Sequence, residues 1–149
     1  VGTLGGYVAA AEPLITYLKN KSRAFIYTTS MPACICAASC EALRIINEEP
    51  ALRARLWKAT TWMREQIQTL GFDTGGSTTP IIPIIIGDER KTLMVADALF
   101  AEGIYVPAVR TPTVPKGQAR LRLTVSAAHT QESLERVCTC LARVKEKLG

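Results

Sequence analysis

The sequence predicts an α+β fold in which helices pack on one face of a small sheet, and three observations indicate it. The chain has 149 residues, the length of one ordinary domain, and 48% of them are hydrophobic, enough for a single core. From Ile81 onward the residue patterns follow the order strand, helix, strand, loop, strand, helix. In residues 120–125, arginine or threonine alternates with leucine or valine, so one face of this strand is polar and the other is apolar.

The first third of the chain predicts a strand, an extended segment and two helices. Residues 6–10 form a short apolar run after a glycine pair, which favours a strand. Pro13 suits the first turn of a short helix, because its fixed φ is already helical. Residues 25–30 are rich in aromatic and hydroxyl side chains and are expected to be extended. Pro32 then begins a helix that runs to about Ile46 and is apolar enough on several sides to be substantially buried.

A second long helix begins at Pro50 and ends at Gly71. Its buried face is an apolar stripe at helical spacing, formed by Leu52, Leu56, Ala59, Met63, Ile67 and Leu70. Residues 81–86 give the strongest strand pattern in the chain. Because Pro83 cannot donate a ladder hydrogen bond, this strand is predicted to lie at an edge or to contain a bulge.

The last third continues the alternation of helices and strands. Asp88 is placed to cap a helix that Gly103 closes. A short strand is predicted at 104–107, followed by a long proline-containing loop at 109–118. Thr130 begins the final helix, whose apolar residues recur at helical spacing.

Composition and charge exclude several classes of protein. The net charge is +5, from 18 Lys and Arg against 13 Asp and Glu, and the basic residues are scattered. A nucleic-acid surface needs a dense stripe of positive charge, so no nucleic-acid partner is expected. No uninterrupted apolar run approaches the length of a membrane-spanning helix, and no secretory leader pattern is visible, so no membrane partner is expected either.

The five cysteines indicate reduced thiols and a cytoplasmic protein, because a secreted disulfide framework usually has an even count. Their spacing lacks the Cys-x-x-Cys pairs of a zinc site, so no metal site is expected. They are interpreted as small buried hydrophobic residues. They are Cys34, Cys36, Cys40, Cys138 and Cys140.

Three places could hold a ligand. Thr28 and Thr29 lie just before a predicted helix start, where hydroxyls and free N–H groups can bind a phosphate or simply cap the helix. Arg120 and Arg122 lie on one face of a strand, where an arginine can hold a carboxylate through two hydrogen bonds; the alternative is a solvated strand face. His129, the only histidine, is expected to cap or to pack rather than to catalyse or bind a metal.

A longer pattern resembles a known family. Residues 105–124 contain Arg-x-Pro-Thr-Val-Pro and Arg-Leu-Arg-Leu-Thr and are followed by Ser-Ala-Ala-His-Thr at 126–130. Together they resemble the C-terminal signature of the α-oxoamine synthases, pyridoxal-phosphate enzymes that condense an amino acid with an acyl-CoA. Residues 5–8, 25–32 and 79–83 are also similar to that family, in consistent order and spacing.

The resemblance implies a fold and a domain organisation. The chain is expected to be the C-terminal portion of a fold type I pyridoxal-phosphate transferase, with a small, mostly antiparallel sheet. Residues 1–48 are expected to be the junction from a large domain that the chain lacks, and residues 49–149 the small α+β domain. The parent protein is expected to be a homodimer that binds pyridoxal 5'-phosphate, an amino acid and an acyl-CoA.

The resemblance also implies roles for individual residues. Arg122 is expected to bind the α-carboxylate of the amino acid, and Thr113 to line the acyl pocket. Thr28 and Thr29 are expected to reach the cofactor phosphate across the dimer interface, while Arg120 is expected to be structural. The Pro112-Thr113 pair favours alanine and a pimeloyl thioester as substrates, with glycine and acetyl-CoA as the alternative. A free-standing domain that binds a carboxylate or a partner without catalysis remains a further hypothesis.

The Schiff-base lysine of this family precedes a Gly-x-x-Gly-Gly-Tyr motif. Aligning Gly2, Gly5, Gly6 and Tyr7 with that motif puts the lysine two positions ahead of Val1. No catalytic residue is therefore expected within these residues. The chain, which does not begin with methionine, is expected to be a piece of a longer protein and to be inactive on its own.

Overall fold

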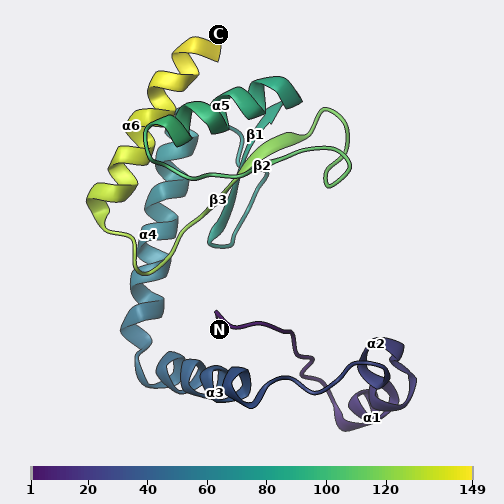
Figure 1. Cartoon of the computed structure of the whole chain (residues 1–149). Coiled ribbons are helices and arrows are strands. Elements are labelled where there is room, and N and C mark those ends of the chain that lie inside the picture. Colours follow the sequence, from purple (N-terminus) through teal and green to yellow (C-terminus); the bar gives the residue numbers. More distant parts are fainter. Residues whose placement is uncertain (1, 149) are drawn as a thin grey trace. The chain divides into compact units, whose positions relative to one another are not determined.

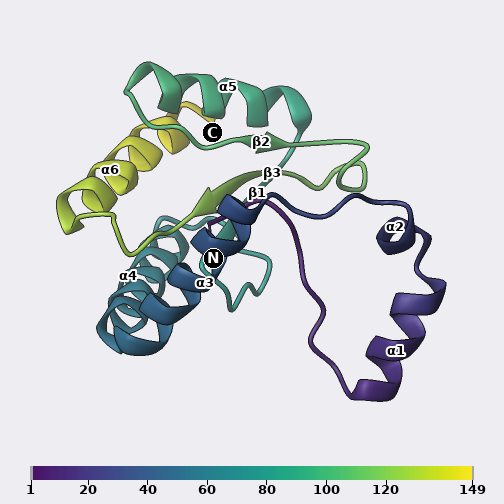
Figure 2. The same ribbon diagram turned by 60° about the horizontal axis from the view of Figure 1, so that its bottom comes forward.

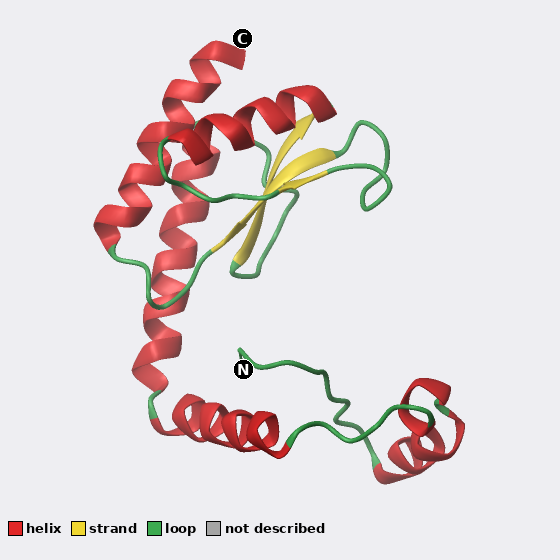
Figure 3. Cartoon of the chain, in the orientation of Figure 1, coloured by secondary structure: helices red, strands yellow, loops and turns green. Residues whose placement is uncertain are grey.

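The computed structural model describes residues 2–148 and divides into two compact units, Val1–Pro50 and Ala51–Gly149. In its described residues the first unit contains α1 (Glu12–Lys21), α2 (Arg23–Ile26) and α3 (Ala33–Glu48), joined by irregular segments (Figures 1 and 3). Pro13 lies in the first turn of α1, as predicted. None of residues 2–50 is buried, so this unit has no core of its own.

The first unit departs from the sequence predictions in three places. Residues 6–10 are irregular and not a strand, because no neighbouring strand in the unit pairs with their backbone groups. Within the segment 25–30, the first two residues belong to α2, where the Phe25 N–H donates to the Ser22 carbonyl at 3.1 Å. The helix predicted after Pro32 is present as α3, but it contains no buried residue.

The exposure of α3 also corrects the interpretation of the cysteines. Cys34, Cys36 and Cys40 are exposed, since no residue of this helix is buried within the first unit. Cys140 is buried and Cys138 is half-buried, as predicted for small hydrophobic side chains.

The second unit contains three helices and three strands in its described residues (Figures 1 and 3). They are α4 (Pro50–Thr69), β1 (Ile81–Gly87), α5 (Glu89–Ala101), β2 (Ala108–Val109), β3 (Ala119–Thr124) and α6 (Gln131–Leu148). The helix caps follow the predictions. Gly71 adopts φ 75° after α4, and the Asp88 carboxylate accepts a hydrogen bond from the Lys91 N–H at 2.8 Å.

The prediction of a strand at 104–107 is wrong by several residues. That segment is irregular, and the paired strand β2 begins only at Ala108. Ile104 and Val106 are nevertheless buried, which explains the apolar pattern. Pro107 has no N–H to give to a ladder, although its carbonyl accepts a hydrogen bond from the Arg122 N–H at 2.9 Å.

The sheet has the order β1-β3-β2 and both pairings are antiparallel, with β3 in the centre. This agrees with the small, mostly antiparallel sheet that was expected. Among the strands of the sheet β1 pairs with β3 alone, so it is an edge strand, with one isolated bridge from Ile85 to Asp73 on its other side. Its register shifts between Ile85 and Gly87. Pro83 is tolerated there because an edge strand needs fewer ladder donors.

The core lies between the sheet and the three helices, as predicted. Figures 1 and 2 show α5 and α6 side by side, next to the strands. Each of α4, α5 and α6 contributes fully buried side chains that pack with the apolar residues of β1 and β3. The fully buried apolar residues are Met63, Ile67, Ile82, Ile84, Val95, Leu99, Leu121 and Leu141. The helices therefore cover one face of the sheet, and the other face remains open for a ligand.

Neither a membrane span nor a metal site is found in the described part of the chain. No helix within residues 2–148 combines the length and the apolar character needed to cross a membrane. Over the same residues, no three His, Cys, Asp or Glu side chains gather as metal ligands.

Candidate functional site

Arg122 lies in the middle of the central strand β3, on the face that the helices do not cover. Its side chain is exposed, whereas its neighbours Leu121 and Leu123 point into the core. In the antiparallel pair of β1 and β3, Arg122 lies opposite Pro83 of β1. On its other side, its N–H donates to the Pro107 carbonyl at 2.9 Å. Among residues 2–148, nothing forms a hydrogen bond or an ion pair with the Arg122 guanidinium. All of its donors are therefore available to an anion.

Arg120 lies on the same face of β3, but its guanidinium is already engaged. Its Nε donates to the Gln118 carbonyl at 2.9 Å, and a terminal N–H donates to Gln118 Oε1 at 3.3 Å. The side chain is half-buried. Of the two arginines, Arg122 is thus the one that can receive a carboxylate through two parallel hydrogen bonds.

The sequence analysis did not single out Gln118. A signal for it exists, because residues two apart on a strand share a face, which brings a glutamine at 118 next to the arginine at 120. An amide oxygen beside a guanidinium is a ready acceptor. The pattern Gln-x-Arg-x-Arg therefore indicates an acceptor close to Arg120, and the rotamers decide whether the bond forms.

Thr113 lies in the loop between β2 and β3 and is exposed. Its N–H donates to the Arg110 carbonyl at 2.9 Å, and the Thr111 N–H donates to a carboxylate oxygen of Glu89 at 3.3 Å. These bonds hold the loop, yet within the described residues no hydrogen bond joins Thr113 to Arg122. Both residues belong to the second unit.

Thr28 and Thr29 belong to the first unit, in the irregular segment between α2 and α3. The Thr28 hydroxyl donates to the Ala24 carbonyl, while no described group pairs with the Thr29 hydroxyl. The alternative role as a simple helix cap is wrong, because the N-cap of α3 is Pro32 and no side chain caps it. The exposed Thr29 hydroxyl keeps its proton for an acceptor such as a phosphate oxygen, so this segment fits the cofactor implied above through Thr29.

His129 caps a turn, as predicted. Its Nδ1 accepts a hydrogen bond from the Ser126 N–H at 3.2 Å, just before α6. The ring is exposed and lies outside the face that carries Arg122.

A half-buried thiol on α6 is the clearest perturbed titratable group of the second unit. Burial raises the pKa of Cys138 to about 11, and the carboxylate of Glu135 adds to the increase. Its sulfur lies 3.5 Å from the sulfur of Met63 in the core. A thiol held protonated in this way is structural and is not a nucleophile.

The geometry can be set beside known proteins. The model of the aminotransferase class I and II family matches residues 1–141. The chain belongs to this family. The resemblance inferred from the motifs is thereby confirmed at the level of the family.

Curated relatives match the chain from end to end. It is 45% identical over 149 residues to the 8-amino-7-oxononanoate synthase of Symbiobacterium thermophilum and 43% identical over 149 residues to that of Thermoanaerobacter pseudethanolicus. In each case the match covers 100% of this chain and 38% of the relative. The chain thus spans well under half of the length of the curated relatives that it matches.

Solved structures share the fold. A serine palmitoyltransferase variant from S. paucimobilis, with a bound PLP–myriocin aldimine, matches with a TM-score of 0.90 and 27% identity over 99% of this chain and 38% of that one. The 8-amino-7-oxononanoate synthase from Francisella tularensis matches with a TM-score of 0.75 and 25% identity over 92% of this chain and 40% of that one. The expected fold, that of the small domain of fold type I transferases, is confirmed.

Proposed function

We propose that the chain is the C-terminal part of an 8-amino-7-oxononanoate synthase. This acyltransferase condenses L-alanine with pimeloyl-CoA, or with the corresponding carrier-protein thioester, and releases carbon dioxide in biotin biosynthesis. The observation that carries the proposal is the match of the whole chain, at 45% identity, to a relative of that name. The free guanidinium of Arg122 supports it, because an amino-acid substrate needs a carboxylate receptor.

The residues of this chain bind and position the reactants. Arg122 holds the α-carboxylate of alanine on the open face of β3, where the paired strands on both sides keep its backbone rigid. Thr113 lies in the loop that precedes β3 and lines the acyl pocket. Thr28 and Thr29 would lie at the phosphate of pyridoxal 5'-phosphate, where the Thr29 hydroxyl would donate to it and the Thr28 hydroxyl, which donates to the Ala24 carbonyl, could accept only. When bound, this cofactor supplies the electron sink that stabilises a carbanion at the α-carbon of the amino acid.

The proposal also concerns the organisation of the parent protein. It is a cytoplasmic homodimer, residues 1–48 join its large domain to the small one, and its Schiff-base lysine precedes Val1. The 149 residues alone therefore have no synthase activity, because the covalent attachment of the cofactor needs that amine. A phosphate-binding hydroxyl and a carboxylate-binding arginine position substrates but cannot replace a nucleophile.

A comparison of two substrate pairs in the full-length protein tests the proposal. The expected result is turnover of alanine with pimeloyl-CoA at a kcat/KM at least about tenfold above that of glycine with acetyl-CoA, as pocket discrimination of a few kcal/mol gives. A preference for glycine and acetyl-CoA would identify a glycine C-acetyltransferase. Absence of both activities in a protein that binds pyridoxal 5'-phosphate and amino acids would favour a non-catalytic binding domain.

A further inference from the structure

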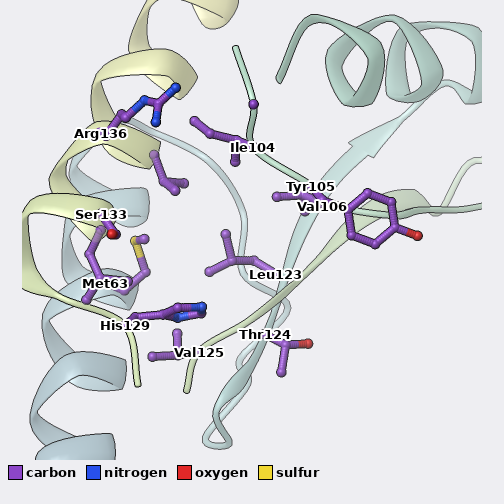
Figure 4. Close-up of a pocket in the computed structure, with 13 residues that line it drawn as sticks. Met63, Ile104, Tyr105, Val106, Leu123, Thr124, Val125, His129, Ser133 and Arg136 are labelled. Carbon is purple, nitrogen blue, oxygen red and sulfur yellow. The ribbon is translucent and has the colours of Figure 1, made fainter. Parts of the chain in front are cut away.

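A cavity of about 240 Å³ lies in the second unit, between the start of α6, the end of β3 and residues 103–106 (Figure 4). Neither Arg122 nor Thr113 lines it, whereas Thr124, two residues beyond Arg122 on the same face of β3, does. All of its lining residues belong to one unit, and the mechanism proposed above uses none of them.

The floor of the cavity is apolar. Met63, Leu123, Val125 and Leu134 line it and are all buried. Val137 of α6 also lines it and is half-buried. Such a floor favours a hydrocarbon group over water or a bare inorganic ion.

The rim of the cavity provides hydrogen-bond donors and positive charge. Figure 4 shows the ring of His129 reaching into the cavity, with Ser133 and Arg136 also at its edge. Because His129 accepts at Nδ1 from the Ser126 N–H, the neutral ring carries its proton on Nε2 and can donate into the cavity. Arg136 uses one terminal nitrogen to donate to the Glu102 carbonyl and keeps its other donors.

No negative charge opposes these donors. The lining residues include no aspartate or glutamate in the part of the chain that the structure describes. The nearby carboxylate of Glu102 is paired with Arg143 at 3.3 Å and not with Arg136. The cavity thus combines an apolar floor with a cationic rim.

We propose that this cavity binds a short aliphatic carboxylate, with the hydrocarbon chain on the floor and the carboxylate at Arg136, while His129 lies at the opposite end of the cavity (Figure 4). The volume sets the length of the ligand. At about 30 Å³ for a group the size of a water molecule, about 240 Å³ holds roughly eight non-hydrogen atoms. Hexanoate has that size. The proposal does not depend on the synthase activity, because it involves neither the cofactor nor Arg122.

Titration of the full-length protein with hexanoate, followed by calorimetry and ligand-observed NMR, tests this proposal. Hexanoate is expected to bind at least about tenfold more tightly than 1-hexanol, since a charge-assisted hydrogen bond is lost in the alcohol. Arg136→Met is expected to lower the affinity for hexanoate by about tenfold. Arg53→Met, at an exposed position of α4 that does not line the cavity, is the control and is expected to leave binding unchanged.

Two further variants locate the ligand. Val137→Phe fills the cavity and is expected to abolish binding, and it serves in place of Arg136→Met if that variant does not fold. Arg122→Met is expected to leave hexanoate affinity unchanged. The proposal is wrong if hexanoate does not bind, if hexanol binds equally well, or if Val137→Phe retains binding. It is equally wrong if Arg122→Met removes binding, because the ligand then occupies the substrate site; loss of synthase activity alone leaves the proposal standing.

Discussion

Replacing Arg122 by methionine removes the guanidinium and keeps an unbranched side chain on the open face of β3. The substitution is expected to leave the fold intact. In the part of the chain that the structure describes, Arg122 has no hydrogen-bond or ion-pair partner to lose, and its side chain is exposed. The free energy of unfolding is therefore expected to change by no more than about 0.5 kcal/mol.

The effect on amino-acid binding depends on how completely water is excluded from the bound ion pair. An exposed ion pair contributes about 0.2–1 kcal/mol, whereas removing one partner of a desolvated, hydrogen-bonded pair costs about 2–5 kcal/mol. On the isolated small domain Arg122 is open to solvent, so the lower range applies there. If the full-length enzyme of the proposed function encloses the bound substrate, the expected loss of affinity is about 30-fold to 4,000-fold.

The assay is the dissociation constant of alanine and the kcat/KM of the synthase reaction, measured for Arg122→Met and for Arg120→Met. Arg120 is the matched control, because it lies on the same strand face but is bonded to Gln118. Its substitution is expected to change alanine affinity by less than about threefold, as for an exposed residue without a ligand contact. The reasoning is refuted if Arg122→Met binds alanine normally, or if the two variants lose affinity equally.

Three further predictions concern stability, each measured by urea unfolding. Leu121→Ala is expected to cost about 2–5 kcal/mol, because this side chain is fully buried on the central strand; a cost below about 1 kcal/mol would contradict its place in the core. Asp88→Ala is expected to cost about 1 kcal/mol through loss of the cap on α5, and Asp88→Asn should restore most of it. The Cys138 thiol has an ordinary pKa of 9.0, which burial raises to about 11 in the folded state. The contribution of the protonated thiol to the free energy of unfolding is therefore complete below about pH 9 and is lost between about pH 9 and 11. In Cys138→Ala the free energy of unfolding should fall less between about pH 9 and 11 than in the original protein. An equal fall in the two proteins would show that the thiol is not its source.

The sequence predicted the second unit well because its local signals agree with its packing. The apolar stripe through Met63 and Ile67 faces the core, the cap at Asp88 is formed, and the alternation at 120–125 became the central strand. Each of these patterns is satisfied within one hundred neighbouring residues of the same unit. Local propensity and tertiary contact therefore point to the same structure.

The first unit was predicted less well because its apolar residues are not buried within the unit. The apolar run at 6–10 has no strand to pair with, and the apolar faces of α3 remain exposed within the unit. The periodicity of apolar residues predicts which face of a helix needs to be buried, but it does not predict whether another element is there to bury it. The same reason explains why Cys34 and Cys36 are exposed while Cys140 is buried.

The candidate site was partly visible in the sequence. Alternation placed Arg120 and Arg122 on the same face, and the structure bears this out. What alternation cannot predict is which arginine is free, since that depends on the Gln118 amide, just before β3, accepting from Arg120. Side-chain hydrogen bonds of this kind depend on rotamers, and a pattern of apolar and polar residues does not encode them.

The alternation along β3 separates stability from chemistry on a single strand. Leu121 and Leu123 point into the core, so their substitution acts through cavities and the free energy of unfolding. Arg122 lies between them in sequence and points away, so under the proposed function its substitution is expected to act on ligand affinity and not on stability. Because the strand is paired on both sides, the backbone that positions Arg122 is held by the same ladder that the buried leucines stabilise. A core substitution can therefore weaken substrate binding only by loosening β3, and it does so together with a measurable loss of stability. A loss of affinity without a loss of stability is the signature of a residue on the open face.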